Sequence, residues 1–151
     1  MGYVIIAIGP KHDPDLSKMI ESYQNRLNHW GGVTWMLLPY GSQDQTVARR
    51  VESDAMRAKL RDDDYVILLD ERGSQLTSPA LATLLDSHRG MTKRIIFIIG
   101  GAYGVDDALR ERANLVWSLS QLVFPHQLVR LILIEQLYRA HTILDNHPYH
   151  H

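Results

Sequence analysis

The sequence contains no cysteine among its 151 residues. This absence excludes a disulfide framework, a thiolate nucleophile and a zinc site built on thiolates. The chain also lacks an apolar run close to the roughly 20 residues that span a bilayer. Its N-terminus has neither the basic segment nor the small-residue cleavage site of a signal peptide. Together these absences predict a cytoplasmic protein that does not enter the membrane.

An excess of positive charge is missing as well. The chain carries 16 Lys and Arg residues against 17 Asp and Glu residues, for a formal net charge of −1. Because nonspecific affinity for phosphates comes from surplus Lys and Arg, a general nucleic-acid coat protein is disfavoured. A specific RNA substrate stays open, since basic side chains can gather on one face. The length suits one domain, and we expect residues 1–151 to form a single one.

Short apolar runs alternate with helix signals along the chain. The runs predict buried strands at Tyr3–Ile8, Val33–Leu38, Tyr65–Leu69, Arg94–Ile99 and Leu115–Leu119. Helices are expected from Pro14, capped by Asp13, to Gly31-Gly32; at about Thr46–Leu60; after a Ser78 cap; near Asp106–Ala113; and over Gln127–Leu144. This alternation, with continuous hydrophobicity in the strands, indicates an α/β fold whose parallel sheet is covered on both faces.

In such sheets a ligand binds beyond the carboxyl ends of the strands. Those ends are Gly9-Pro10, Leu69–Glu71, Gly100–Gly104 and Leu119–Pro125. The glycine spacing after Ile99 is neither the dinucleotide fingerprint nor a phosphate loop. A tight structural turn and a ligand-binding loop are equally compatible with it.

Two segments near the C-terminus allow more than one interpretation. Between the last strand and the last helix, Ser120 or a neighbour could cap the helix, or the loop backbone could hold an adenine. The last helix is apolar on nearly every side, so it packs in the core or against a partner. Glu135 and Arg139, four positions apart, form either a surface ion pair or buried charges in a dimer interface.

The tail from Asn146 to His151 is rich in histidine. Such a cluster can serve as metal ligands, a proton relay, a remnant of a purification tag or a frayed end. No carboxylate or cysteine pattern accompanies His147 and His150, so we predict no metal site. Pro148 and Tyr149 favour an ordered tail, because they supply rigidity and a stacking face.

Several motifs in this order resemble the RlmH-type pseudouridine methyltransferases, which are compact members of the SPOUT class. The resemblance covers the whole chain and is densest between Ile98 and His150. Its motifs are Ile98–Gly101, Trp117–Ser120, Pro125-His126, Leu128–Arg130, Glu135–Ala140 and Asn146–His150. The chain departs from the family pattern at Ala102-Tyr103, after the double glycine, and at His151.

The resemblance implies a parallel-sheet SPOUT (α/β knot) fold with a C-terminal trefoil knot, in a homodimer. It implies methylation of N3 of a pseudouridine in 23S rRNA of the assembled 70S ribosome, with S-adenosyl-L-methionine as the cofactor. The implied cofactor contacts are Leu69, Gly100, Leu119, Ser120, Gln121, Leu122, Val123 and Phe124. The polar residues implied near the dimer interface and target base are Arg130, Glu135, Arg139, His147, Tyr149 and His150.

For the chemistry itself, we expect the catalytic residues to be Arg130, Arg139, Tyr149 and His150. Arg139 or Arg130 would stabilise the anionic target ring, and Tyr149 and His150 would position it. A histidine could instead accept the ring proton. Two alternatives remain open: a SPOUT methyltransferase for another rRNA or tRNA nucleotide, and a noncatalytic protein that binds the cofactor or the ribosome.

Overall fold

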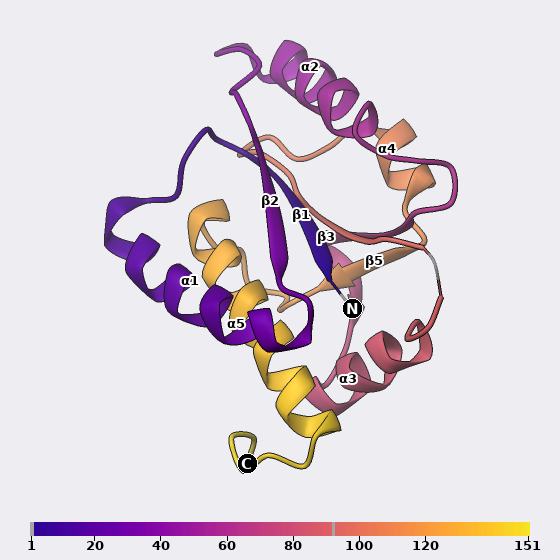
Figure 1. Ribbon diagram of the computed structural model, residues 1–151. Helices are drawn as coiled ribbons and strands as arrows, with labels where there is room; N and C mark the ends of the chain where they lie inside the picture. Colours follow the sequence, from indigo (N-terminus) through magenta and orange to yellow (C-terminus); the bar gives the residue numbers. More distant parts are fainter. Residues whose placement is uncertain (1, 92) are drawn as a thin grey trace.

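The computed structural model describes residues 2–91 and 93–151 and shows a five-stranded parallel sheet between two layers of helices (Figure 1). The strands, in the spatial order β2-β1-β4-β3-β5, are β1 (Tyr3–Ile8), β2 (Val33–Leu38), β3 (Tyr65–Gln75), β4 (Ile95–Ile99) and β5 (Leu115–Ser118). The helices are α1 (Pro14–Leu27), α2 (Gln45–Arg57), α3 (Ser78–Ser87), α4 (Asp107–Arg112) and α5 (His126–Leu144), and a 3-10 turn, η1 (Asn28–Trp30), follows α1. The predicted α/β class and parallel sheet are confirmed.

Each face of the sheet has its own hydrophobic core, because successive side chains of a strand point to opposite faces. On one face Ile5, Phe97 and Trp117 pack against α1, α3 and α5. On the other face Ile6 and Ile98 pack against α2 and α4. Figure 1 shows these two layers, with α2 and α4 at one end of the view and the C-terminus at the other.

The helix ends follow local chemistry. Asp13 caps α1 by accepting a hydrogen bond from the amide of Asp15 at 2.8 Å, as predicted. Thr77, not Ser78, caps α3: its hydroxyl accepts from the amide of Ala80 at 3.1 Å. The predicted cap is wrong by one residue because Pro79 fits the second helical position as well as the first. No helix within the described ranges is long and apolar enough to cross a membrane.

The strand predictions need two corrections. β2 is an edge strand whose side chains are mostly half-buried, so the prediction of a buried strand is wrong there. β3 does not end at Leu69 but continues to Gln75. Leu69 and Ser74 both pair with Trp117 of β5, so the four residues between them bulge out of the ladder. The bulge is what carries Asp70 and its neighbours toward the edge of the sheet where the strands end.

The other boundaries lie close to the prediction. β4 begins one residue late, at Ile95, and the side chain of Arg94 just before it pairs with the carboxylate of Asp64 at 2.7 Å. α2 ends at Arg57 instead of Leu60, and α5 begins at His126 instead of Gln127.

Candidate functional site

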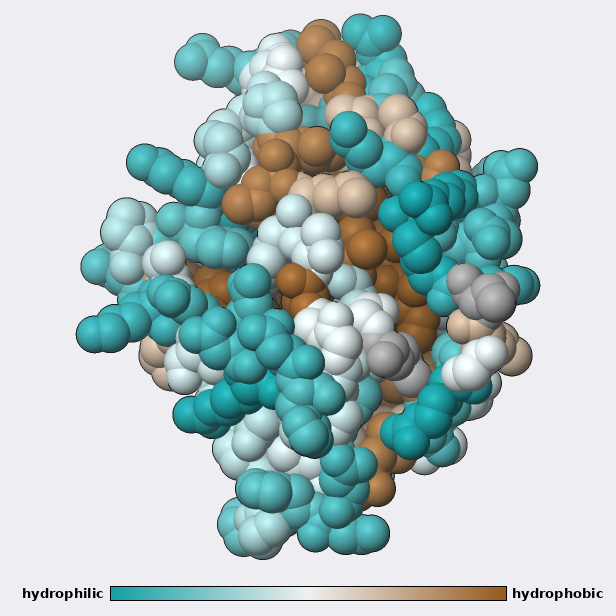
Figure 2. Space-filling view, viewed as in Figure 1, coloured by the Kyte–Doolittle hydropathy of each residue, from teal (hydrophilic) through white to brown (hydrophobic). Residues whose placement is uncertain are grey.

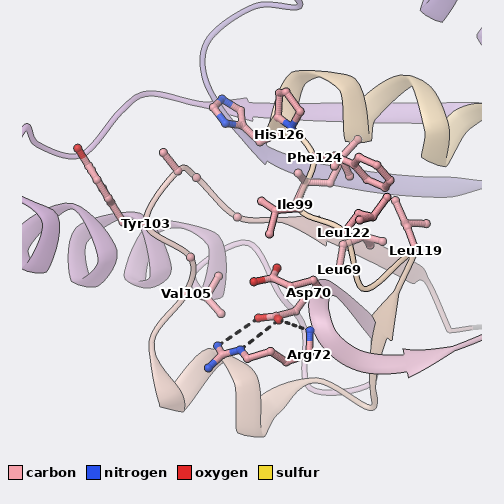
Figure 3. A pocket seen from close by; sticks show the side chains of 18 of the residues that line it. Leu69, Asp70, Arg72, Ile99, Tyr103, Val105, Leu119, Leu122, Phe124 and His126 are labelled. Carbon is pink, nitrogen blue, oxygen red and sulfur yellow. Dashed lines mark hydrogen bonds and ion pairs between the residues drawn. The ribbon is translucent and has the colours of Figure 1, made fainter.

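A pocket of about 720 Å³ opens at the carboxyl edge of the sheet (Figure 3). Its size lies in the range of small-molecule sites. Its walls come from the β3 bulge, the glycine loop after β4, the loop after β5 and the first turn of α5. This is the edge at which the sequence predicted a ligand site, because the carboxyl ends of parallel strands meet there.

The structure brings most of the predicted cofactor contacts together here. The pocket is lined by Leu69, Gly100, Leu119, Ser120, Leu122, Val123 and Phe124. Gln121 is exposed and does not line it. In Figure 3, Leu69, Leu119 and Leu122 gather at one side, whereas Tyr103 and His126 lie at another. The pocket therefore has an apolar part and a polar part.

The glycine loop is both a tight turn and a wall of the pocket. The carbonyl of Gly101 accepts from the amide of Gly104 at 3.1 Å, and Gly104 has a φ of 75°. A Cβ on Gly101 would lie 2.5 Å from Oε1 of Glu52, which is itself buried on α2. The absence of a side chain at Gly101 thus leaves room for the end of the Glu52 side chain beside the loop. The tight turn is confirmed, and ligand binding by this loop stays a prediction.

The serines after β5 shape the loop and do not cap α5. Pro125 occupies the cap position, where no side chain makes a capping hydrogen bond. The hydroxyl of Ser118 donates to the carbonyl of Ser120 at 2.8 Å, and the hydroxyl of Ser120 accepts from the amide of Leu122 at 3.0 Å. The prediction of a serine cap is therefore wrong, since both hydroxyls are used within the pocket wall.

Asp70, in the β3 bulge, is a carboxylate of the pocket that ion pairs and hydrogen bonds hold in place. Its carboxylate accepts hydrogen bonds from the amide and guanidinium of Arg72 and from the guanidinium of Arg110 on α4. Burial alone would raise the pKa of Asp70, but these bonds outweigh it and hold the pKa below its ordinary value. Asp70 is therefore an ionised group that ties the β3 bulge to α4.

Sequence reasoning named the strand end at Asp70 but assigned no role to the residue, and it did not place His126 in the pocket. Both residues could have been found from the sequence, since each adjoins a strand or loop end that was expected to line the site. The sequence could not show which side chains at those ends turn toward the pocket.

Arg130 is not in the pocket. It has 0% exposure, and its guanidinium donates to the carbonyls of Ile8, Gly9 and Lys11 and to Nδ1 of His12, at 2.7 to 3.2 Å. No carboxylate pairs with it among the described residues. Burial lowers its pKa. These contacts hold the turn after β1 against α5 and leave the guanidinium no path to a ligand in this conformation.

The other three predicted catalytic residues form one cluster at the far end of α5. Arg139 donates to Glu135 Oε1 from Nε at 3.0 Å and from a terminal nitrogen at 2.6 Å. The hydroxyl of Tyr149 donates to the same oxygen at 3.0 Å, and Arg139 stacks on the Tyr149 ring. Arg139 also donates to Nδ1 of His150 at 3.2 Å. The tail is thus held in place, as Pro148 and Tyr149 predicted.

His147 is exposed, and its side chain makes no interaction with this cluster. No group of three or more His, Cys, Asp or Glu residues within residues 2–91 and 93–151 is arranged to hold a metal ion.

The cluster and the pocket lie far apart in one chain. Arg139 follows His126 by 13 positions on α5, which corresponds to about 20 Å along the helix axis. Figure 1 shows the C-terminus at the opposite end of the molecule from α2 and α4. The structure therefore assembles two separate groups of predicted site residues.

Comparison with known proteins agrees with this fold. A family model described as "Predicted SPOUT methyltransferase" matches residues 1–150. The ribosomal RNA large subunit methyltransferase H of Geobacter metallireducens is 39% identical over 152 residues, covering 97% of each chain. The protein of the same name from Christiangramia forsetii is 36% identical over 152 residues with the same coverage, and that of Gloeobacter violaceus is 49% identical over 100 residues, 66% of this chain and 65% of its own. The chain therefore belongs to the SPOUT methyltransferase family.

Proposed function

We propose that this protein is a cytoplasmic methyltransferase that uses S-adenosyl-L-methionine to methylate N3 of a pseudouridine in 23S rRNA of the assembled ribosome. The observation that carries the proposal is the pocket at the carboxyl edge of the sheet, which is lined by seven of the eight predicted cofactor contacts. Relatives that match almost the whole chain are named ribosomal RNA large subunit methyltransferase H, which supports the same function. Residues 1–151 would act as one domain. A C-terminal trefoil knot remains a prediction.

The pocket fits the proposed cofactor in size and in the chemistry of its walls. Leu69, Leu119 and Leu122 offer an apolar side suited to an adenine ring. Ser118 and Ser120 fix the backbone of the adjoining loop, whose amides and carbonyls could distinguish one base from another. Asp70 is ionised, and Arg72 and Arg110 balance its charge, so it fixes the β3 bulge at the edge of the pocket. When bound there, the cofactor would supply an electrophilic methyl group on a sulfonium.

The tail cluster offers hydrogen-bond donors and a positive charge. Arg139 can only donate, so Nδ1 of His150 must accept, and the ring proton of a neutral His150 therefore lies on Nε2. Burial, together with hydrogen bonds to Tyr23 and Glu135, raises the pKa of Tyr149 far above its ordinary value. Nε2 of His150 would thus donate to the target ring. The hydroxyl hydrogen of Tyr149 is already used on Glu135, so Tyr149 would hold the ring in place by contact, and Arg139 would stabilise the negative charge that the ring acquires.

The separation of the two groups supports a homodimer. If the pocket and the tail cluster act on one nucleotide, they must come from different chains, because about 20 Å of helix separates them within one. The loop beside the pocket exposes Leu122 and Val123 to 69% and 78%. Such exposure of large apolar side chains is typical of a surface that a partner covers.

The direct test uses methyl-labelled S-adenosyl-L-methionine and 70S ribosomes that lack the modification. Label on N3 of a pseudouridine in 23S rRNA, mapped by mass spectrometry, is expected. Label on a different rRNA or tRNA nucleotide would replace the proposed target. Cofactor binding without transfer to any RNA would favour a noncatalytic binding protein.

A mixed dimer tests whether two chains share one site. One chain would carry Arg139→Ala, and the other would carry Gly100→Trp to fill the pocket. Each homodimer should be inactive, whereas the mixed dimer should recover roughly half of the wild-type activity through one intact composite site. No recovery, with both chains folded and dimeric, would contradict a shared site.

A further inference from the structure

N3 of a uracil-type ring carries a proton that must leave before or during methyl transfer, and the protein has to provide for it. The tail cluster does not contain an evident acceptor. Oε1 of Glu135 already accepts from Arg139 and Tyr149, and its Oε2 accepts from the amide of Gln136 at 2.8 Å. Nδ1 of His150 is likewise occupied by Arg139. These acceptors of the cluster are all occupied, whereas the pocket that would hold the methyl donor has ionisable groups of its own.

We propose that His126, the first residue of α5, is the catalytic base that takes this proton. Its imidazole lines the pocket, and Figure 3 shows it away from Leu119 and Leu122 and across the cavity from Asp70 and Arg72. Within the described residues, no hydrogen bond engages either ring nitrogen. A lone pair on this ring is thus free to meet a substrate. The inference rests on the proposed methylation of a ring nitrogen.

The charges around His126 favour the neutral ring. Burial lowers its pKa below the ordinary 6.5, the Arg130 cation beneath it on α5 lowers it further, and Glu52 on α2 opposes them. The imidazole is therefore an uncharged base at neutral pH. A neutral imidazole has a lone pair on one ring nitrogen and can accept a proton there.

The other ionisable groups of the pocket are less suited. Asp70 is bound to Arg72 and Arg110, which hold its pKa low and make it a weak base. Arg72 is a cation and cannot accept a proton. Tyr103, from the glycine loop, offers a phenol hydroxyl, which already carries a hydrogen of its own. Glu71, on the β3 bulge, is the remaining rival because its carboxylate is not paired with a cation.

The transfer is balanced as follows. His126 takes the proton from N3 and becomes an imidazolium. The nitrogen uses the electron pair so released to bond to the methyl carbon, while the carbon–sulfur bond breaks and its pair returns to sulfur. The positive charge thereby passes from the sulfonium to the imidazolium, which then loses the proton to solvent. No further reactant is needed.

The test measures single-turnover methylation of unmodified 70S ribosomes at saturating enzyme between pH 5.5 and 8. For the wild type the rate should fall as the pH drops through a midpoint below 6.5, because an imidazolium cannot accept a proton. His126→Gln should lower the rate by about 10²–10⁴-fold, abolish this acid limb and leave cofactor affinity, measured by calorimetry, within about threefold. Free imidazole should restore part of the rate to His126→Ala.

The controls separate this inference from the proposed function. Wild-type protein that methylates no ribosomal particle would refute the proposed function itself. If the wild type is active, the role of His126 would be overturned by a His126→Gln variant that keeps both the rate and its fall at low pH. It would also be overturned if only Glu71→Gln lost them. Lost cofactor affinity without rescue by imidazole would also overturn it, because His126 would then be a cofactor contact. His29→Gln, far from the pocket on η1, should behave as the wild type.

Discussion

Replacement of Arg130 by methionine should destabilise the protein without removing a catalytic group. The guanidinium donates to four acceptors, three of them main-chain carbonyls at the end of β1 and in the turn that follows. Hydrogen bonds from a charged group contribute roughly 1.5 kcal/mol each at the low end, or about 6 kcal/mol in all. Methionine also removes a buried charge that has no carboxylate partner, and this stabilises the folded state by roughly 2–3 kcal/mol.

The net loss should therefore be about 3–4 kcal/mol, a large share of the 5–15 kcal/mol that is typical for a folded domain. For a chain of this length, that corresponds to a fall in Tm of about 10 °C. The Tm of Arg130→Lys should lie between those of the wild type and Arg130→Met, because an ammonium keeps the charge but cannot reach all four acceptors. Thermal and urea unfolding of the three proteins would measure these differences.

The same proteins decide between a structural and a catalytic role. Methylation should be measured at least 15 °C below the Tm of the weakest variant and expressed per folded molecule. We expect Arg130→Met to keep a rate within about tenfold of the wild type. A Tm within 2 °C of the wild type together with a rate loss above 100-fold would refute the structural account and restore the role predicted from the sequence.

Three further predictions concern stability and the tail. Gly73→Ala should lower the free energy of unfolding by about 3 kcal/mol or more, because the new Cβ would lie 2.4 Å from the main-chain oxygen of Val116. The control Gly90→Ala should lower it by only about 1 kcal/mol, because a Cβ there meets nothing within 4 Å although φ is +80°. Equal urea midpoints for the two variants would contradict this. Burial, and then Arg89, lower the pKa of His141 to about 4, although Asp145 opposes them. The unfolded chain therefore binds more protons, and the free energy of unfolding should fall by on the order of 3 kcal/mol as the pH drops from 6.5 to 4. In His141→Gln, the urea midpoint should lose most of this dependence on pH. Tyr23 and Tyr149 share a hydrogen bond of 3.1 Å, so Tyr23→Phe and Tyr149→Phe should couple by about 0.5–1 kcal/mol in a double-mutant cycle on unfolding, whereas additive effects would exclude a direct bond.

The location of the pocket could be predicted from the sequence because it depends on a general property of parallel sheets. Their carboxyl ends share an edge, so Leu69, Gly100 and Leu119 had to lie near one another once five strands were assigned. The bulge in β3 could not be predicted. It depends on how closely the backbone of β5 approaches Gly73, and that approach is set by a partner more than 40 positions away.

Arg130 and Arg139 show the same limit for individual side chains. Both are arginines on α5, and both belong to motifs of the resemblance. Arg130 faces the main-chain oxygens at the end of β1 and is fully buried, whereas Arg139 faces Glu135 and the tail. The helical pattern cannot separate these cases, because the neighbours that distinguish them come from other elements and from the tail's own path.

Helix α5 connects the two halves of the proposed site. Its first residue, His126, lines the pocket, and its last turns hold the tail cluster. α1 and α3 pack against its inner side, which keeps its two ends at a fixed separation. A rigid spacer of this kind suits a composite site, because docking a second chain would bring two preformed halves together.

The half-buried residues Leu128, Leu131, Ile132 and Glu135 follow one another at helical spacing on α5 and form one face of it. Figure 2 shows hydrophobic residues at the surface among a mostly hydrophilic periphery. Because Tyr149 and His150 are already held by contacts within their own chain, dimerisation would not have to order the tail, and less of the association free energy would be lost to ordering. It follows that changes on the Leu128–Glu135 face should weaken the proposed dimer, whereas Tyr149→Phe should leave it intact and lower the methylation rate, beyond its small effect on stability.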